Sequence, residues 1–148
     1  MIWKPHVTVA AIACVDDRYL LVEEDADNEI VFNQPAGHLE KNETLTAAVI
    51  REVLEETAWD FEPDSVTGIY LYPNPGLDIT YLRVCFSGRC LRHHPGRGLD
   101  KGIIRAVWMS RQEVADNQDR MRSPLVLRCI DDHIAGRTYP LDFLNYIS

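Results

Sequence analysis

Two apolar runs near the start of the chain predict a strand hairpin. Residues 6–14 are rich in Val, Thr and Ala, and a second run covers residues 19–22, after Asp16 and Asp17. Short β-branched runs separated by a polar pair are typical of two paired strands. Similar runs at residues 31–32, 66–72, 79–86 and 103–109 are separated by turn-forming residues, so we expect a mixed, mainly antiparallel sheet.

Helical periodicity replaces this pattern in the middle of the chain. A buried helical stripe is predicted at Leu45, Ala48, Val49 and Val53. The segment from Ser110 to Glu113 has the spacing of a capping box and opens a second helix. Ser123 and Pro124 cap a third helix, which we expect to end at Gly136. Strands with helices on both faces predict an α/β fold, arranged as an α/β/α sandwich.

Two polar segments lie between the predicted strands. The first is an acidic run of Glu23, Glu24, Asp25, Asp27 and Glu29. We interpret this run as a solvated loop tip, and the alternative is that Glu23 or Glu24 lies at the rim of a functional site. The second segment covers residues 33–38, where proline and glycine predict a loop. These residues allow a sharp turn that brings the backbone close to a ligand.

Length and charge narrow the class of protein. The chain has 148 residues, 46% of them hydrophobic, which suits one domain with one core over residues 1–148. The formal net charge is −8. This excess of acidic residues disfavours a general nucleic-acid binder, because Lys and Arg hold phosphate backbones.

Cysteine usage and the first residues exclude further classes. The four cysteines lack the Cys and His spacings of a zinc site, so we expect Cys14, Cys85, Cys90 and Cys129 to be reduced and mostly to pack in the interior. The N-terminal apolar stretch has no basic region or cleavage site, and it is too short to span a membrane. We therefore expect a cytoplasmic protein that does not bind membranes.

Three glutamates indicate metal chemistry. Glu52, Glu55 and Glu56 stand at positions i, i+3 and i+4, so their carboxylates share one helix face and repel one another. A hard divalent cation such as Mg²⁺ would offset this repulsion, because it takes oxygen ligands and substrate phosphates. The alternative is a solvated acidic helix face without a ligand.

These glutamates belong to a longer motif. Its fixed positions are Gly37, Glu43, Arg51, Glu52, Glu55 and Glu56, with apolar Val53 and Trp59 at the required offsets. The motif resembles the signature of the Nudix hydrolases and matches six of its seven fixed positions. The departure is Ala58, which stands where the family has glycine.

The resemblance extends outside the motif. Residues 4–10, 32–40, 122–125 and 137–141 are similar to the NudJ-type phosphatase branch of the Nudix superfamily. That branch implies Mg²⁺-dependent release of phosphate from hydroxymethylpyrimidine diphosphate, thiamin diphosphate and nucleoside di- and triphosphates. One alternative is a nucleotide-cleaning or ADP-ribose pyrophosphatase that releases nucleoside monophosphate. Another is a non-catalytic ligand sensor, which the intact glutamates disfavour.

The resemblance also implies roles for individual residues. Glu52 and Glu56 are expected to bind the metal ion, together with a backbone carbonyl of Ala36 or Gly37. Glu55 is expected to be a further ligand or the general base. Mg²⁺ is the expected cofactor, with Mn²⁺ as a substitute. An acidic chain that acts on anionic phosphates needs such a cation, because the ion reverses the local charge.

The remaining candidate residues are expected either to support the structure of the site or to bind the substrate. Glu43 and Arg51 are expected to form an ion pair that holds the loop against the helix, with a direct catalytic role as the alternative. His38 is a candidate phosphate ligand or a residue with local hydrogen bonds only. Asp100 is a candidate outer metal or base residue, or a plain loop aspartate. The expected partner is a small phosphorylated substrate, and the resemblance favours a monomer over a dimer.

Overall fold

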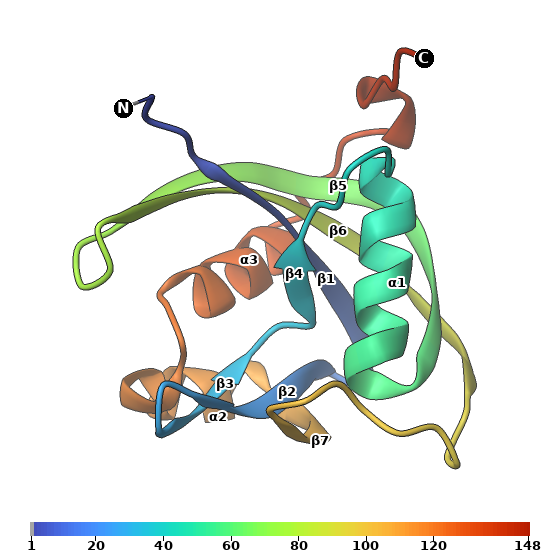
Figure 1. Cartoon of the computed structure of the whole chain (residues 1–148). Coiled ribbons are helices and arrows are strands. Elements are labelled where there is room, and N and C mark those ends of the chain that lie inside the picture. The colour runs from blue at the N-terminus through green and yellow to red at the C-terminus, as the bar shows by residue number, and fades with distance from the viewer. Residues whose placement is uncertain (1) are drawn as a thin grey trace.

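The computed structural model describes residues 2–148, in which helices cover both faces of a twisted sheet (Figure 1). The strands are β1 (His6–Val15), β2 (Arg18–Ala26), β3 (Glu29–Asn33), β4 (Ala36–His38), β5 (Trp59–Asn74), β6 (Ile79–His93) and β7 (Ile103–Ser110). The helices are α1 (Leu45–Thr57), α2 (Arg111–Asp116) and α3 (Leu125–Ile134), with short 3-10 turns η1 (Gln118–Arg120) and η2 (Leu141–Phe143). No helix in the described residues is long and apolar enough to cross a membrane.

The sheet is mixed and mainly antiparallel, as predicted. Its strand order is β3-β2-β1-β6-β5, while β4 pairs with β1 and β7 pairs with β2. The pairing of β1 with β6 is parallel, and the other strand pairs are antiparallel. Strand β1 therefore lies at the centre, where it connects the hydrogen-bonding networks of the other strands.

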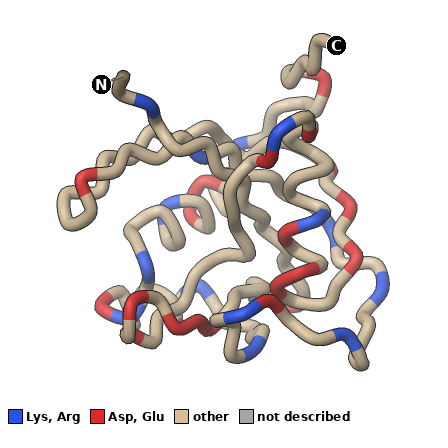
Figure 2. Tube along the Cα trace, viewed as in Figure 1, with Lys and Arg blue, Asp and Glu red and all other residues tan. Residues whose placement is uncertain are grey.

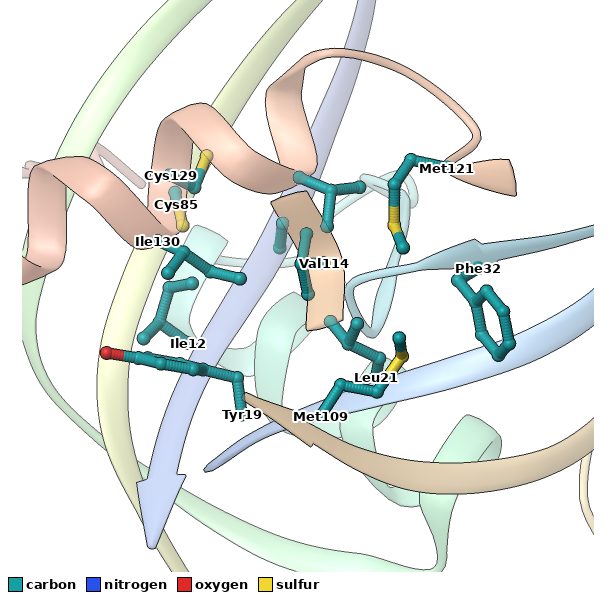
Figure 3. Close-up of a cluster of buried hydrophobic side chains, with 12 residues drawn as sticks. Ile12, Tyr19, Leu21, Phe32, Cys85, Met109, Val114, Met121, Cys129 and Ile130 are labelled. Carbon is teal, nitrogen blue, oxygen red and sulfur yellow. The ribbon is translucent and has the colours of Figure 1, made fainter. Parts of the chain in front are cut away.

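Successive side chains of β1 point to opposite faces of the sheet, so they contribute to two separate parts of the core, one under each helical layer. Alternate residues Val9, Ala11 and Ala13 pack in a cluster with Ala48, Val49 and Val53 of α1. The residues between them face the opposite side, where Figure 3 shows the second cluster, including Ile12, Cys85, Cys129 and Ile130. The predicted α/β/α sandwich is confirmed.

Helix α1 has a defined cap at each end. The hydroxyl of Thr44 accepts a hydrogen bond from the Ala47 backbone N–H, which begins the helix. At the other end Ala58 adopts a left-handed conformation with φ of 62°, and its N–H donates to the Leu54 carbonyl at 3.0 Å. Ala58 therefore makes the turn for which the family pattern uses glycine.

The prediction of a loop tip is correct for Asp27 and wrong for the rest of the acidic run. Residues 23–25 and 29 belong to β2 and β3, and the turn between these strands contains Asp27 and Asn28. Basic side chains from later in the chain neutralise the half-buried Glu23 and the buried Glu24: Glu23 pairs with Arg105 at 2.9 Å and Glu24 with Arg122 at 2.8 Å. Local sequence does not show these partners, because they lie about a hundred residues away.

Other boundaries also differ from the prediction. The end of the predicted loop at residues 33–38 forms β4, because its backbone pairs with β1. Strands β5 and β6 extend well beyond residues 66–72 and 79–86, since their ladder continues through polar and charged positions. The capping box at Ser110 is present, and α3 ends at Ile134, two residues before Gly136.

Candidate active site

Strand β4 and helix α1 approach closely at Gly37. The pairing of Gly37 with Val9 holds β4 against the central strand. A Cβ atom at residue 37 would overlap the carboxylate of Glu52. Glycine is required here to admit that carboxylate, and the backbone does not need a left-handed conformation.

Arg51 ties the motif together through its guanidinium. Its Nε donates to Glu43 Oε2 at 2.6 Å and its Nη2 to Glu43 Oε1 at 3.0 Å, so the expected ion pair is present and bidentate. Its Nη1 donates to Glu52 Oε1 at 2.7 Å, and Nη2 reaches the His38 carbonyl at 3.1 Å. The hydrogen bond to Arg51 lowers the pKa of the Glu43 carboxyl. Arg51 thus fixes the Glu52 carboxylate beside β4.

Three carboxylates converge where α1 meets the loop before β7. Glu52, Glu55 and Asp100 each place one oxygen so that the three atoms lie within 4.8 Å of one another. The Asp100 N–H donates to the Glu55 carbonyl at 2.9 Å, which fixes the loop on the helix. Burial raises the pKa of both the Glu52 and the Glu55 carboxyl, and the neighbouring acids raise them further.

Glu56 lies on the β4 side of the helix, outside this group of three. Its side chain is buried, and its Oε1 accepts a hydrogen bond from the Ala36 N–H at 2.9 Å. Burial raises the pKa of the Glu56 carboxyl to about 9. The negative charge of Glu56 is therefore poorly compensated by the protein alone.

A cavity of about 570 Å³ opens beside these residues. Glu52 and Glu56 lie on one side of it, and its walls come from segments that are far apart in the sequence. The segments 32–40 and 122–125 meet there, contributing Asn33, Ala36, Gly37, His38, Glu40, Arg122, Ser123 and Leu125. The volume falls within the range of about 300–1,000 Å³ that is usual for small-molecule sites.

Comparison with known proteins shows which family has this combination of fold and motif. The chain matches the NUDIX domain family over residues 4–128. It belongs to the Nudix hydrolase family. Phosphatase NudJ of Escherichia coli (strain K12) is 34% identical over 143 residues, which cover 97% of this chain and 92% of NudJ. Nudix hydrolases act on phosphoanhydride bonds of small phosphorylated substrates.

Solved structures agree with the assignment. A Nudix hydrolase from Nitrosomonas europaea is 50% identical, with a TM-score of 0.95 over 97% of this chain and 98% of that chain. A bifunctional NMN adenylyltransferase/ADP ribose pyrophosphatase from Francisella tularensis, complexed with AMP and a Mn ion, is 22% identical. Its TM-score is 0.70 over 90% of this chain and 42% of that chain, which shows the shared fold.

The donor set of this Nudix hydrolase fits a divalent cation. Carboxylate oxygens of Glu52, Glu55 and Asp100 are hard ligands, with Glu56 and the Ala36 backbone close by. Glu55 and Glu56 lie in the last turn of α1, where the helix dipole is unfavourable for anions and no basic residue is present. Figure 2 shows acidic positions along α1 and along the β2–β3 hairpin. A bound cation would relieve this repulsion.

The histidine of the motif loop lies in the cavity wall and has a local side-chain partner. His38 lines the cavity, and its Nε2 lies 3.2 Å from Nδ1 of His6. Burial lowers the pKa of His38, so its imidazole is neutral near pH 7. The contact with His6 orients the His38 ring.

Sequence analysis did not single out two residues of the cavity wall, Thr8 and Arg83. Both are more than nine-tenths buried, and they are register partners on β1 and β6. A usable signal was present, because each polar residue interrupts an apolar strand at an inward-facing position. By contrast, Arg89, further along β6, is exposed and pairs with Glu62 and Asp64.

Proposed function

We propose that this Nudix hydrolase removes the terminal phosphate from small diphosphates and triphosphates in a Mg²⁺-dependent reaction. The supporting observation is the cavity in which the acidic face of α1 meets residues 32–40 and 122–125, the segments that resemble the NudJ branch. The identity of 34% to phosphatase NudJ over nearly the whole chain supports the same activity.

The proposed substrates are those of the NudJ branch. They are hydroxymethylpyrimidine diphosphate, thiamin diphosphate and nucleoside di- and triphosphates. Tyr72 and Tyr81 are register partners on β5 and β6 and line the cavity, where aromatic rings can contact a heterocycle. We propose that residues 1–148 act as one domain and as a monomer, which light scattering coupled to size-exclusion chromatography would test.

The proposed roles are those that the resemblance to the Nudix motif implies. Bound Mg²⁺ would neutralise phosphoryl oxygens and acidify a water molecule. Glu52 and Glu56 are the proposed ligands, with Arg51 orienting Glu52 and the Ala36 N–H orienting Glu56. Glu55 is the proposed general base, because its raised pKa and its contact with Asp100 suit it to accept a proton. Glu43 acts through Arg51 and is a positioning residue.

A turnover screen tests the proposal. Phosphorylated metabolites, including the substrates above, would be incubated with Mg²⁺, and released phosphate would be measured with and without a chelator. Mg²⁺-dependent phosphate release from diphosphates is the expected result. Release of nucleoside monophosphate from ADP-ribose, with diphosphates left intact, would favour the ADP-ribose pyrophosphatase instead.

A further inference from the structure

The floor of the cavity changes from apolar to polar along one face of the sheet. On the α3 side, Ala10 of β1 and Cys85 of β6 are register partners within the apolar cluster. Two residues earlier on each strand, Thr8 and Arg83 are the next register partners on the same face. The apolar core therefore ends where the cavity begins.

Arg83 carries a buried charge without an acidic partner. Its side chain makes one hydrogen bond within residues 2–148, from Nη1 to Oε1 of Gln34 at 2.8 Å, and no ion pair. Only two buried side-chain polar atoms in these residues lack a hydrogen-bond partner, and they are Arg83 Nε and Thr8 Oγ1. Buried charged and polar groups are normally paired, so this neighbouring pair indicates a missing ligand.

The other charged residues of the cavity explain which ligand is missing. Arg122, the other arginine in the lining, is already paired with Glu24 at 2.8 Å. The lining otherwise carries the carboxylates Glu24, Asp27, Glu29, Glu40, Glu52, Glu56 and Asp119. Arg83 is thus the arginine in this lining that has no carboxylate partner, so a ligand that pairs with it must carry negative charge.

Gln34 holds the guanidinium in place. Its side chain is fully buried, its Nε2 donates to the Ala11 carbonyl at 3.3 Å, and its Oε1 accepts from Arg83. This leaves guanidinium donors of Arg83 for the cavity that the residue lines. Arginine suits phosphate oxygens in particular, because its planar fork offers several donors at once.

We propose that Arg83 and Thr8 form a second oxyanion subsite, which binds a phosphate of the substrate that the metal ion does not hold. This inference rests on the proposed function, because it states how the second phosphate of a diphosphate is recognised. The metal end and the Arg83 end of one cavity would then hold the two ends of the diphosphate group.

Binding of inorganic phosphate in metal-free buffer with a chelator tests the subsite without requiring turnover. Calorimetry and thermal shift would be run at constant ionic strength with chloride as the salt control. Arg83→Met is expected to weaken phosphate binding about tenfold or more. Its melting temperature without phosphate should change little, because removal of an uncompensated buried charge offsets the lost hydrogen bond to Gln34 Oε1. Arg83→Lys, which keeps the charge, should bind with intermediate affinity.

Thr8→Val provides a milder variant with a matched control. It should weaken phosphate binding about threefold to tenfold without lowering the melting temperature, because the Thr8 hydroxyl has no protein partner. Thr67→Val makes the same change at an equally buried residue outside this cavity, where the hydroxyl bonds to Ser87 Oγ at 2.5 Å. That control should lower the melting temperature and leave phosphate affinity unchanged.

Three results would overturn the subsite. They are no phosphate-specific binding by the parent protein, unchanged affinity in Arg83→Met and Thr8→Val, or equal weakening in Thr67→Val. Because turnover is measured in a separate assay, failure of the subsite can be distinguished from failure of the proposed function. Phosphate binding that depends on Arg83 in a protein without hydrolase activity would refute the proposed function alone. Mg²⁺-dependent hydrolysis with a normal KM in Arg83→Met would refute the subsite alone.

Discussion

Glu56 joins a buried carboxylate to the backbone of β4, and this geometry makes its replacement by glutamine informative. Glutamine keeps the shape and can still accept the Ala36 hydrogen bond, but it lacks the charge that a metal ligand supplies. We expect Glu56→Gln to lower kcat about a hundredfold or more with the fold intact. Mg²⁺ should raise its melting temperature less than it raises that of the parent protein. Unchanged turnover would remove Glu56 from the site.

The same variant should change how stability depends on pH when no metal is present. Burial raises the pKa of Glu56 from its ordinary value of 4.5 to about 9, so the folded protein holds a proton that the unfolded chain releases. This contribution to stability is fully present below about pH 4.5 and is lost as the pH rises towards 9. The melting temperature of Glu56→Gln relative to the parent should therefore increase with pH in chelator. A difference that stays constant from pH 5 to 9 would contradict the prediction.

Ala58 is a residue with a side chain in a conformation that favours glycine. Its left-handed φ of 62° costs roughly 1 kcal/mol relative to glycine. We expect Ala58→Gly to raise the free energy of unfolding by up to about 1 kcal/mol, as measured by urea denaturation. Ala135→Gly is the matched control, because Ala135 caps α3 with φ of −69° and should lose stability on substitution. Destabilisation by Ala58→Gly would show that its buried methyl group matters more than the backbone.

At the scale of elements, the close contact between β4 and α1 requires that residue 37 has no side chain. Gly37→Ala would place a methyl group on the Glu52 carboxylate and push it away from Arg51 or from the cavity. We expect a loss of about 1–3 kcal/mol in unfolding free energy and at least a tenfold loss of kcat. Gly98→Ala is the control, because a methyl group there meets no atom within 4 Å. Equal behaviour of the two variants would show that β4 can move away from α1.

The elements differ in how far the sequence predicts them. Helix α1 was predictable, because its apolar stripe is local, and the Glu43–Arg51 ion pair was expected from the resemblance to the family motif. Strand β4 was not, because residues 36–38 become a strand only through their pairing with β1. The acidic hairpin of β2 and β3 was missed for the same reason, since the arginines that neutralise Glu23 and Glu24 come from distant segments.

At the scale of the whole molecule, folding assembles the site from separate parts of the chain. The motif glutamates predicted one side of the cavity, while the pairing of Thr8 with Arg83 arises from a parallel register between strands 75 residues apart. The approach of Asp100 to Glu52 and Glu55 likewise depends on how the loop before β7 folds onto α1. Spacing along the chain predicts the grouping of the motif glutamates. It does not predict the pairing of Thr8 with Arg83 or the approach of Asp100 to α1.

The product formed from a nucleoside triphosphate would show how the assembled cavity positions its substrate. A metal ion held by the motif glutamates would fix where the phosphoryl group reacts, so the bond that breaks would depend on how far the substrate extends towards residues 32–40 and 122–125. We expect inorganic phosphate and nucleoside diphosphate as first products with Mg²⁺, followed by the monophosphate. Phosphorus NMR distinguishes phosphate from pyrophosphate directly. Predominant pyrophosphate, with diphosphates left untouched, would mean that the substrate slides one phosphate further, as in a nucleotide-cleaning pyrophosphatase.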